Sequence, residues 1–302
     1  MAERKTAIRL PRIACEITPD GVAAARAQDS VIGEMHHCRL PAGAVTPALT
    51  SQNVQNARAL SEAIGQALSA VGGRGQEVIA VLPDSAVRMT LLDFDSLPEK
   101  RSEAEAAVRF RLRKSLPFDI DKAAVSFDPQ QTPQGLRVAA SIVLQSVLEE
   151  YESAFRDAGS SPGVVMPSSV GALGAVEEPR PAMLLKVCRD STAVAVASEG
   201  QLLLFRILEG AGNTALTAAH LADDIYPSLV YFQDNYGLQV EHLLVSGVPG
   251  LKELAPALEE HTGMRVRELI GPAIAAGAAA GGTAVAAHNL RNQFAGAIGA
   301  LL

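Results

Sequence analysis

The sequence predicts an α/β protein of two lobes, because one order of secondary structure occurs twice along its 302 residues. In each half, three strand-like runs precede a helical run, and a fourth strand-like run follows it. The two copies are offset by roughly 170 residues. A third unit with strands and helices of its own lies between them. Because 48% of the residues are hydrophobic and only 20% are charged, each lobe can form a buried core.

Period-2 alternation and short apolar runs predict the strands of the first half. Apolar side chains then recur at helical spacing until Val71-Gly72-Gly73, which favours the end of a helix. The elements expected here are strands Arg12–Ile17, Val22–Gln28 and Val31–Leu40, helix Asn53–Val71 and strand Glu77–Leu82.

The second half shows the same order, with Glu199-Gly200 as the turn of a hairpin. The last strand is broken by Gly247 to Gly250, which include Pro249. The elements expected are strands Met183–Cys188, Thr192–Ser198 and Gln201–Leu208, helix Thr214–Tyr236 and strand Val240–Ser246.

The middle unit reads as a small α/β insertion in the first lobe, followed by a return segment and a proline-rich hinge at 177–181. Its expected strands are Val87–Phe94, Ala124–Phe127 and Leu136–Leu144, and its helices are Pro98–Arg113 and Ser146–Asp157. The return consists of strand Val164–Met166 and a helix over 168–176. We therefore expect a first lobe at 1–85, an inserted subdomain at 86–161, the return and hinge at 162–181, and a second lobe with a C-terminal helix at 182–302.

Composition excludes several classes of function. The net charge of −7 is the opposite of what a general nucleic-acid binder carries. The three cysteines show no metal-binding spacing, and no motif of a hydrolase or P-loop enzyme is present. No apolar stretch follows Arg4, Lys5 and Arg9, so we do not expect a signal peptide. Residues 269–290 lack charged side chains, but their Ala and Gly content favours a loop and last helix over a membrane span.

Several stretches carry a resemblance to a known family through their order along the chain. They are Val81–Val87, Glu105–Arg113 with Leu116–Ile120, Leu148–Gly159 with Val164–Leu173, Leu221–Tyr231, and Phe294–Leu301. In this order they resemble the PilM family of type IV pilus assembly, within the bacterial FtsA/PilM group of actin-like proteins. The match departs from the family at Asp224 and Pro227. The resemblance implies a bilobal actin-like ATPase fold, which is a duplicated ribonuclease H-like fold, with the small α/β insertion subdomain in the first lobe.

The resemblance also implies a nucleotide site between two hairpins, each with an acidic residue and a glycine near the phosphates. In the first hairpin Glu16 is acidic, but Thr18 stands where the glycine is expected. In the second, Lys186 replaces the acidic residue and Cys188 replaces the glycine. A lysine cannot ligate Mg²⁺, although it could neutralise a phosphate.

The remaining candidates for contact with a nucleotide lie in the second hairpin and in the loop after the last strand. They are Ser191, Thr192, Gly247 and Gly250. Since phosphoryl transfer depends on a positioned metal, we expect no catalytic residues, no bound metal and no useful hydrolysis. No cofactor is required, although ATP or ADP could bind without turnover.

What the family implies about partners is a cytoplasmic scaffold, held at the inner membrane by a PilN-like bitopic protein. The partner's N-terminal tail would lie between the first lobe and the insertion, and Pro83, Arg88, Arg109 and Arg113 are the candidates for contact. Other pilus platform or motor proteins and a homo-oligomer or ring are further expected partners, and nucleic acid is not. The basic residues near Arg113 have an alternative explanation, which is a favourable interaction with the helix dipole.

Two other functions stay open. The first is a working ATPase or sugar-kinase-like enzyme of the actin-like superfamily, which Thr18 and Lys186 disfavour. The second is a scaffold of type II secretion, because the cytoplasmic region of GspL resembles the same two lobes. Mg²⁺-dependent ATP hydrolysis would identify the first, and a transmembrane helix beyond the lobes would identify the second.

Overall fold

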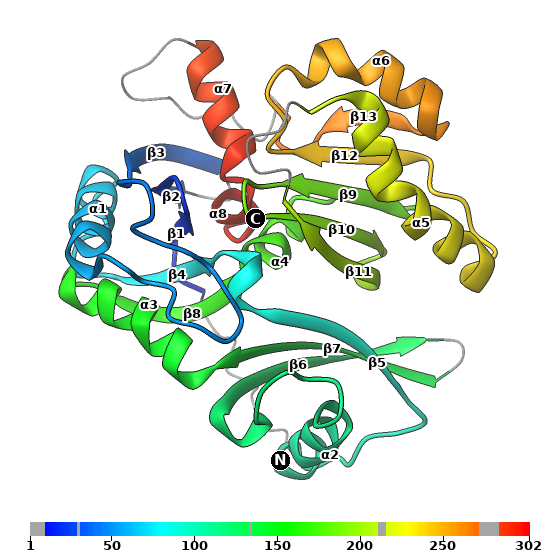
Figure 1. The fold of residues 1–302 in the computed structure, drawn as a ribbon, viewed down its shortest axis with the longest axis horizontal. Coiled ribbons are helices and arrows are strands. Elements are labelled where there is room, and N and C mark those ends of the chain that lie inside the picture. The colour runs from blue at the N-terminus through cyan, green and yellow to red at the C-terminus, as the bar shows by residue number, and fades with distance from the viewer. Residues whose placement is uncertain (1–9, 29–30, 133–134, 211–215, 272–283) are drawn as a thin grey trace.

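The computed structural model describes residues 10–28, 31–132, 135–210, 216–271 and 284–302. Its described strands form two five-stranded sheets and one three-stranded sheet. Figure 1 shows the two larger sheets side by side, with the third extending from the first lobe. The molecule is therefore bilobal, with an insertion, as the sequence predicts.

The first lobe is organised around the sheet β3-β2-β1-β4-β8. The strands β1, β2 and β3 form an antiparallel meander, while β4 and β8 lie parallel to β1. The bounds are β1 Ile13–Thr18, β2 Gly21–Gln28, β3 Val31–Arg39, β4 Glu77–Leu82 and β8 Ser161–Pro167. Each predicted strand of this half is confirmed to within a few residues at its ends.

The second lobe repeats that order in the sheet β11-β10-β9-β12-β13, with the same pattern of antiparallel and parallel pairs. Its bounds are β9 Ala182–Val187, β10 Ser191–Ser198, β11 Gln201–Glu209, β12 His242–Ser246 and β13 Arg265–Glu268. The helices between them are α5 Ala218–Tyr236 and α6 Leu251–Thr262. Sequence analysis missed α6 and β13, because α6 contains Pro256 and β13 is short and rich in charge.

The inserted sheet has the order β5-β7-β6 and carries helix α2. The bounds are β5 Arg88–Phe94, β6 Ala123–Thr132, β7 Gly135–Leu144 and α2 Arg101–Leu112, with short 3-10 turns at Asp84–Ala86 and Ile120–Lys122. Strand β6 is longer than predicted, because its polar second half pairs with β7 as far as Thr132.

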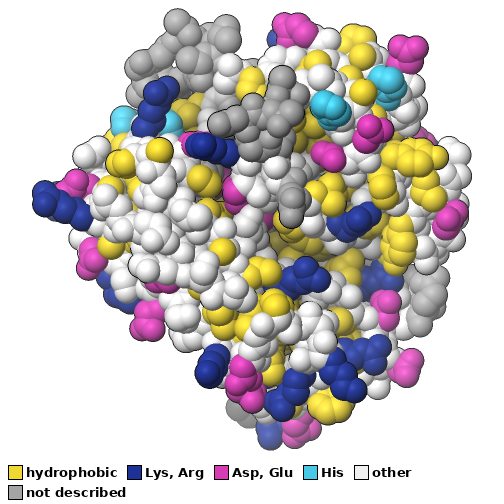
Figure 2. All heavy atoms as spheres, in the orientation of Figure 1, with side chains coloured by type: hydrophobic (Ala, Val, Ile, Leu, Met, Phe, Trp, Pro, Cys, Tyr) yellow, Lys and Arg dark blue, Asp and Glu magenta, His cyan; other side chains and the backbone are white. Residues whose placement is uncertain are grey.

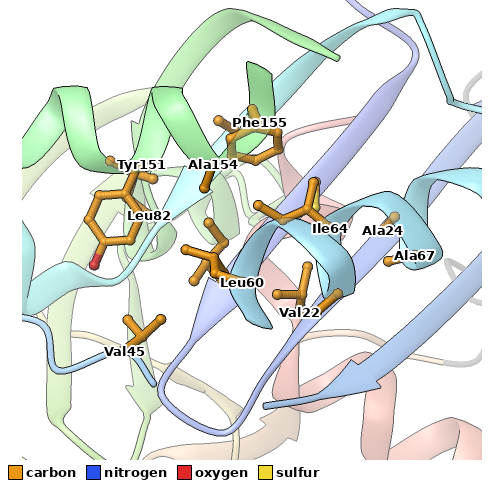
Figure 3. Packing of buried hydrophobic residues seen from close by; sticks show 14 of the residues in the cluster. Val22, Ala24, Val45, Leu60, Ile64, Ala67, Leu82, Tyr151, Ala154 and Phe155 are labelled. Carbon is orange, nitrogen blue, oxygen red and sulfur yellow. The ribbon is translucent and has the colours of Figure 1, made fainter. Parts of the chain in front are cut away.

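Helix α3, Gln145–Asp157, was expected in the insertion but packs in the core of the first lobe. Its Tyr151 and Phe155 share a buried cluster with Leu60 and Ile64 of helix α1, Ala57–Ala70. Figure 3 shows Phe155 beside Leu60 and Ile64. We therefore propose that the insertion ends at Leu144 rather than at residue 161.

The two lobes meet at helices α4, Ser168–Leu173, and α8, Ala295–Gly299. Their backbones lie so close that a Cβ atom on Gly174 would come within 2.2 Å of the carbonyl oxygen of Gly299. One buried apolar cluster includes Phe294 and Ile298 together with strands of both lobes. In Figure 1, α8 lies at the centre of the molecule, between the two large sheets. Helix α7, Ala284–Gln293, leads into it.

Candidate functional site

A pocket of about 280 Å³ lies between the lobes, where the ends of β1, β9 and β12 meet. Loops after the carboxyl ends of strands commonly form ligand sites in α/β proteins. The turn β1–β2 contributes Thr18, Pro19 and Asp20, and the turn β9–β10 contributes Cys188 and Arg189. The loop after β12 and the chain near residue 292 complete the lining. The two hairpins predicted from the sequence therefore face one another.

Glu16 and Lys186 form an ion pair beneath this pocket. Strand side chains alternate between two faces, and Glu16 shares its face with Ala14, while Lys186 shares its face with Leu184. Ala14 and Leu184 both belong to the cluster between the lobes. The ammonium Nζ of Lys186 lies 3.4 Å from Oε1 of Glu16, and neither side chain is exposed to solvent. The two sheets thus meet through opposite charges.

The carboxylate of Glu16 has further partners from both sides of the hinge. The hydroxyl of Ser168 donates to Oε1, and the backbone amide of Ala297 donates to Oε2 at 2.8 Å. Burial raises the pKa of Glu16, while Lys186 and these two donors act in the opposite direction. The donors satisfy a buried carboxylate that could not otherwise be tolerated.

Asp84 is a second buried carboxyl group in this cluster. It follows β4, and its Oδ1 accepts hydrogen bonds from the backbone amide of Ser169 at 2.8 Å and from the Ser169 hydroxyl at 2.7 Å. Burial raises the pKa of Asp84, and the charge of Lys186 opposes the rise. One lysine thus lies close enough to two carboxyl groups to affect both.

Lys186 also donates to Sγ of Cys188 at 3.0 Å. Burial lowers the pKa of Lys186, but Cys188, Glu16 and Asp84 together act more strongly and raise it. Lys186 is therefore held inside the protein, within reach of a carboxyl group and a thiol. Lys186 thus supplies a basic side chain beside Glu16 and Cys188 at the base of the pocket.

Two polar contacts join the lobes nearer the surface. The guanidinium of Arg189 lies 2.6 Å from Oδ1 of Asp20, and both side chains are about half exposed. The hydroxyl of Ser85 donates to Oδ2 of Asp190 at 2.8 Å. Each contact links the turn β9–β10 to the first lobe, so this turn is tied to the opposite lobe at two points.

The predicted nucleotide residues occupy three different environments. Thr18 and Gly247 line the pocket. Glu16 and Lys186 lie buried beneath it, and Ser191 and Thr192 are buried in β10, each 2% exposed. Gly250 precedes α6 in a left-handed conformation, with φ of 70°. Gly247 has φ of 80°, and a Cβ there would come within 1.9 Å of the carbonyl oxygen of Val187, so only glycine fits.

The predicted partner-binding residues do not form one surface patch. Pro83 is buried at the end of β4, while Arg88 is exposed at the start of β5. Arg109 pairs with Glu105 and donates to the carbonyl oxygens of Ile120 and Ala123, so it holds the insertion together.

Arg113, the fourth candidate, forms an exposed ion pair with Asp121 at 3.2 Å. Its position near the end of α2 is also consistent with the dipole interaction considered from the sequence.

Sequence reasoning missed Asp84, Ser168 and Ser169 as members of the cluster. Their positions carried a usable signal, because all three lie within two residues of the carboxyl end of a strand, β4 or β8. The donor Ala297 carried no such signal, since it contributes only its backbone amide. Among the described residues, no group of three acidic, histidine or cysteine side chains is arranged to hold a metal ion.

Within the described part of the chain, no helix is long and apolar enough to cross a bilayer. Most of the charge-free segment discussed above, residues 272–283, lies outside the described residues, as does the start of the helix predicted from Thr214.

No protein-family model and no curated protein matches the chain. Solved structures do. The structure of a PilM-PilN type IV pilus biogenesis complex matches with a TM-score of 0.75 at 21% identity, over 96% of this chain and 98% of that chain. The cytoplasmic domain of EpsL, an inner membrane component of the type II secretion system of Vibrio cholerae, matches with a TM-score of 0.50 at 12% identity, over 77% and 81%.

The ethanolamine utilization protein EutJ from Carboxydothermus hydrogenoformans matches with a TM-score of 0.54 at 8% identity, over 96% of this chain and 90% of that chain. At such identities the likeness concerns the fold. The duplicated sheets, the hinge between them and these matches agree with one another. The chain has the bilobal actin-like fold.

Proposed function

We propose that this protein is a non-catalytic scaffold of a type IV pilus inner-membrane platform, which binds the N-terminal cytoplasmic tail of a PilN-like membrane protein. The observation that carries the proposal is the likeness to the PilM-PilN structure, which extends over nearly the whole of both chains. The insertion is part of that likeness, so the elements that would flank a tail are present in both proteins.

A groove between the insertion and the lobes supports the binding of a tail. It has a volume of about 410 Å³ and is lined by Met89 and Phe127 of the inserted sheet and by Val164 and Met166 of β8. Strand β8 is the end strand of its sheet. An extended peptide can add to such a strand while its side chains enter apolar pockets.

The groove differs from the surface predicted from the sequence. Its described lining contains acidic residues, including Asp128 and Glu199, and neither lysine nor arginine. It therefore suits an apolar tail with a positive charge of its own better than an acidic tail. Arg109 lies outside this lining and is held by bonds within the insertion.

Lys186 supports the absence of catalysis. ATP hydrolysis on this fold would need a divalent cation beside the phosphates, and the ammonium of Lys186 supplies a fixed positive charge at 3.4 Å from Glu16 instead. Binding of ATP or ADP without turnover is a second candidate function, favoured by the pocket of about 280 Å³ next to Gly247.

Binding to a membrane-anchored tail would place the scaffold on the cytoplasmic side of the inner membrane. Homo-oligomerisation and contacts with other platform or motor proteins belong to the same proposal. The likeness to the EpsL domain makes a type II secretion platform the related alternative.

The test is calorimetric titration with a synthetic peptide of the partner's N-terminal tail. We expect binding by the wild-type protein and at least roughly tenfold weaker binding by Val164→Gln/Met166→Gln, which places polar groups in the groove. The matched control is Tyr226→Ala, an exposed apolar residue on α5. Equal affinity of wild type and the double variant would contradict the groove, and no binding of any PilN-like or GspL-partner tail would contradict the function.

The absence of ATP hydrolysis and the binding of nucleotide are tested separately. We expect no Mg²⁺-dependent ATP hydrolysis above background. If nucleotide binds, ligand at 100 times its dissociation constant will stabilise the fold by about 2.7 kcal/mol, which a thermal melt detects. Measurable turnover of ATP would refute the proposal that a protein with Lys186 at this position is non-catalytic.

A further inference from the structure

The most exposed large apolar side chain among the described residues is Phe110, on helix α2 of the insertion. Its exposed fraction is 79%, compared with 65% for Tyr226 on the second lobe. Phe110 shares the outer face of α2 with Ala106, one turn earlier, which is also exposed. The opposite face carries Val108 and Leu112, both fully buried in the core of the insertion. Phe110 therefore contributes nothing to that core.

Three basic residues lie close after Phe110 in the sequence. Arg111, Arg113 and Lys114 follow it, and all three are exposed. Arg113 is paired with Asp121, whereas Arg111 and Lys114 have no ion pair among the described residues. The protein as a whole carries a net charge of −7, so this end of α2 is locally opposite to the rest of the chain. Figure 2 shows Lys and Arg side chains gathered over the lower end of the molecule, where Figure 1 places α2.

The shape of this surface limits its occupant. An aromatic side chain that projects from a helix with 79% of its surface exposed does not line a groove, and Figure 1 shows α2 at the end of the molecule remote from α8 and the hinge. An exposed aromatic group beside unpaired cations is the arrangement that proteins use at the boundary between lipid headgroups and acyl chains. A protein partner would need a cavity for Phe110 together with acidic groups around it.

We infer that the C-terminal end of α2 is a contact surface for an anionic lipid bilayer, with Phe110 entering the interface and Arg111 and Lys114 lying against the headgroups. This contact is independent of the tail-binding groove, which none of these three residues lines. In this contact Arg111 and Lys114 would lie within the distance of roughly 10 Å from the headgroups over which charges act in moderate salt. The binding should therefore weaken as ionic strength rises.

The first experiment is flotation of the full chain with vesicles of phosphatidylcholine, with and without phosphatidylglycerol. No partner protein is present, so failure here leaves the proposed tail binding untouched. We expect recovery with the anionic vesicles at low salt and none with phosphatidylcholine alone. Arg111→Glu/Lys114→Glu should weaken partitioning at least roughly 30-fold, because each lost cation near such a surface costs about a factor of five.

A matched control separates this patch from total charge. Arg74→Glu/Lys252→Glu changes the net charge by the same amount at exposed positions of the two lobes. We expect it to bind as wild type does, after allowance for a small uniform repulsion. An equal loss in both double variants would overturn the assignment to α2, as would the failure of wild type to bind anionic vesicles.

The second experiment uses the absence of tryptophan from the chain. Phe110→Trp introduces a single tryptophan at the proposed point of insertion, and Tyr226→Trp introduces one on α5 as the control. On addition of anionic vesicles, we expect a blue shift and quenching by brominated lipid for the first variant only. Binding without a blue shift at Phe110→Trp, or with the same shift at Tyr226→Trp, would contradict insertion by α2. Capture of an acidic protein by wild type that fails to bind vesicles would identify a protein interface instead.

Discussion

The two lobes present opposite charges at corresponding places. In the first lobe, the third strand of the order β3-β2-β1-β4-β8 carries Glu16, and in the second lobe the corresponding strand β9 carries Lys186. Both side chains point into the region between the lobes, where they lie 3.4 Å apart. Two carboxylates at this separation would repel one another and require a cation between them. A carboxylate and an ammonium require none.

The difference shows how the two halves of a duplicated fold can be joined by a direct ion pair. The first lobe carries Glu16 and its donor Ser168, and the C-terminal helix α8 supplies the second donor, the amide of Ala297. The second lobe supplies the positive charge through the side chain of Lys186 on β9. The charge that balances Glu16 is thus a side chain of the protein itself.

Removal of the buried cation should have the largest effect. Lys186→Met leaves Glu16 and Asp84 buried without a counter-charge, and loss of one partner of a buried pair typically costs about 3–5 kcal/mol. Urea unfolding of wild type and variant measures the difference. The control is the double variant Glu16→Gln/Lys186→Met, which removes both charges and should recover part of the loss. If the double variant loses more unfolding free energy than the two single variants lose together, the pair is not the source of the effect.

Lys186→Asp tests the comparison directly, because it makes the two lobes alike. We expect an unstable protein whose thermal midpoint rises with millimolar Mg²⁺, since oxygen ligands from both lobes would then face one another. At 100 times the dissociation constant the gain would be about 2.7 kcal/mol. Wild type should show no such rise, and an equal response of both proteins to Mg²⁺ would argue against a role of Lys186 as the built-in cation.

Alkaline pH should destabilise the protein through Cys188. Burial raises the pKa of its thiol from 9.0 to about 11, and Lys186 only partly opposes this. In the unfolded chain the thiol ionises near pH 9, whereas the folded protein retains the proton, so stability is full below pH 9 and falls as pH rises toward 11. Unfolding free energies from pH 8 to 11 measure the slope, and Cys188→Ala should make it shallower. An identical slope in Cys188→Ala would assign the loss to other groups.

The exposed contact between the lobes should matter least. Arg189 and Asp20 are about half exposed, and such pairs contribute about 0–1 kcal/mol. Arg189→Ala should therefore leave the thermal midpoint within a few degrees of wild type, while Lys186→Met lowers it markedly. A large loss for Arg189→Ala would mean that the mouth of the pocket, and not its base, joins the lobes.

The strand order could be read from the sequence because each strand is an apolar or alternating run with turn residues at its ends. The same alternation predicts that Glu16 and Ala14 share a face, and it holds in both sheets. The local pattern does not show which residues of the other lobe that face packs against. The sequence predicts Lys186 near the phosphates of a nucleotide. The structure pairs it with Glu16 beneath the pocket, and local pattern cannot predict this pair because the two residues are 170 positions apart in the chain.

The other differences between the predicted and the observed elements concern helices. The amphipathic period of α3 predicts a buried face, but it does not predict which core receives that face. Its place in the first lobe is therefore visible only in the structure. The sequence does not predict helix α6, since Pro256 interrupts its pattern. The role of α8 depends on glycine contacts with α4, and small residues carry little periodic signal.

The hydrogen bond from the amide of Ala297 to Glu16 has a consequence for biosynthesis. The two residues are 281 positions apart, so a ribosome that adds about 5–20 residues per second needs roughly 15–60 s to make the donor after the acceptor. During that interval the nascent first lobe carries Glu16 without the donor that Ala297 provides in the folded protein. The apolar surface of α4 that α8 covers in the folded protein is also exposed. The first lobe is therefore the first to be translated and among the last parts of the molecule to be completed, which makes its nascent form a natural client for chaperones.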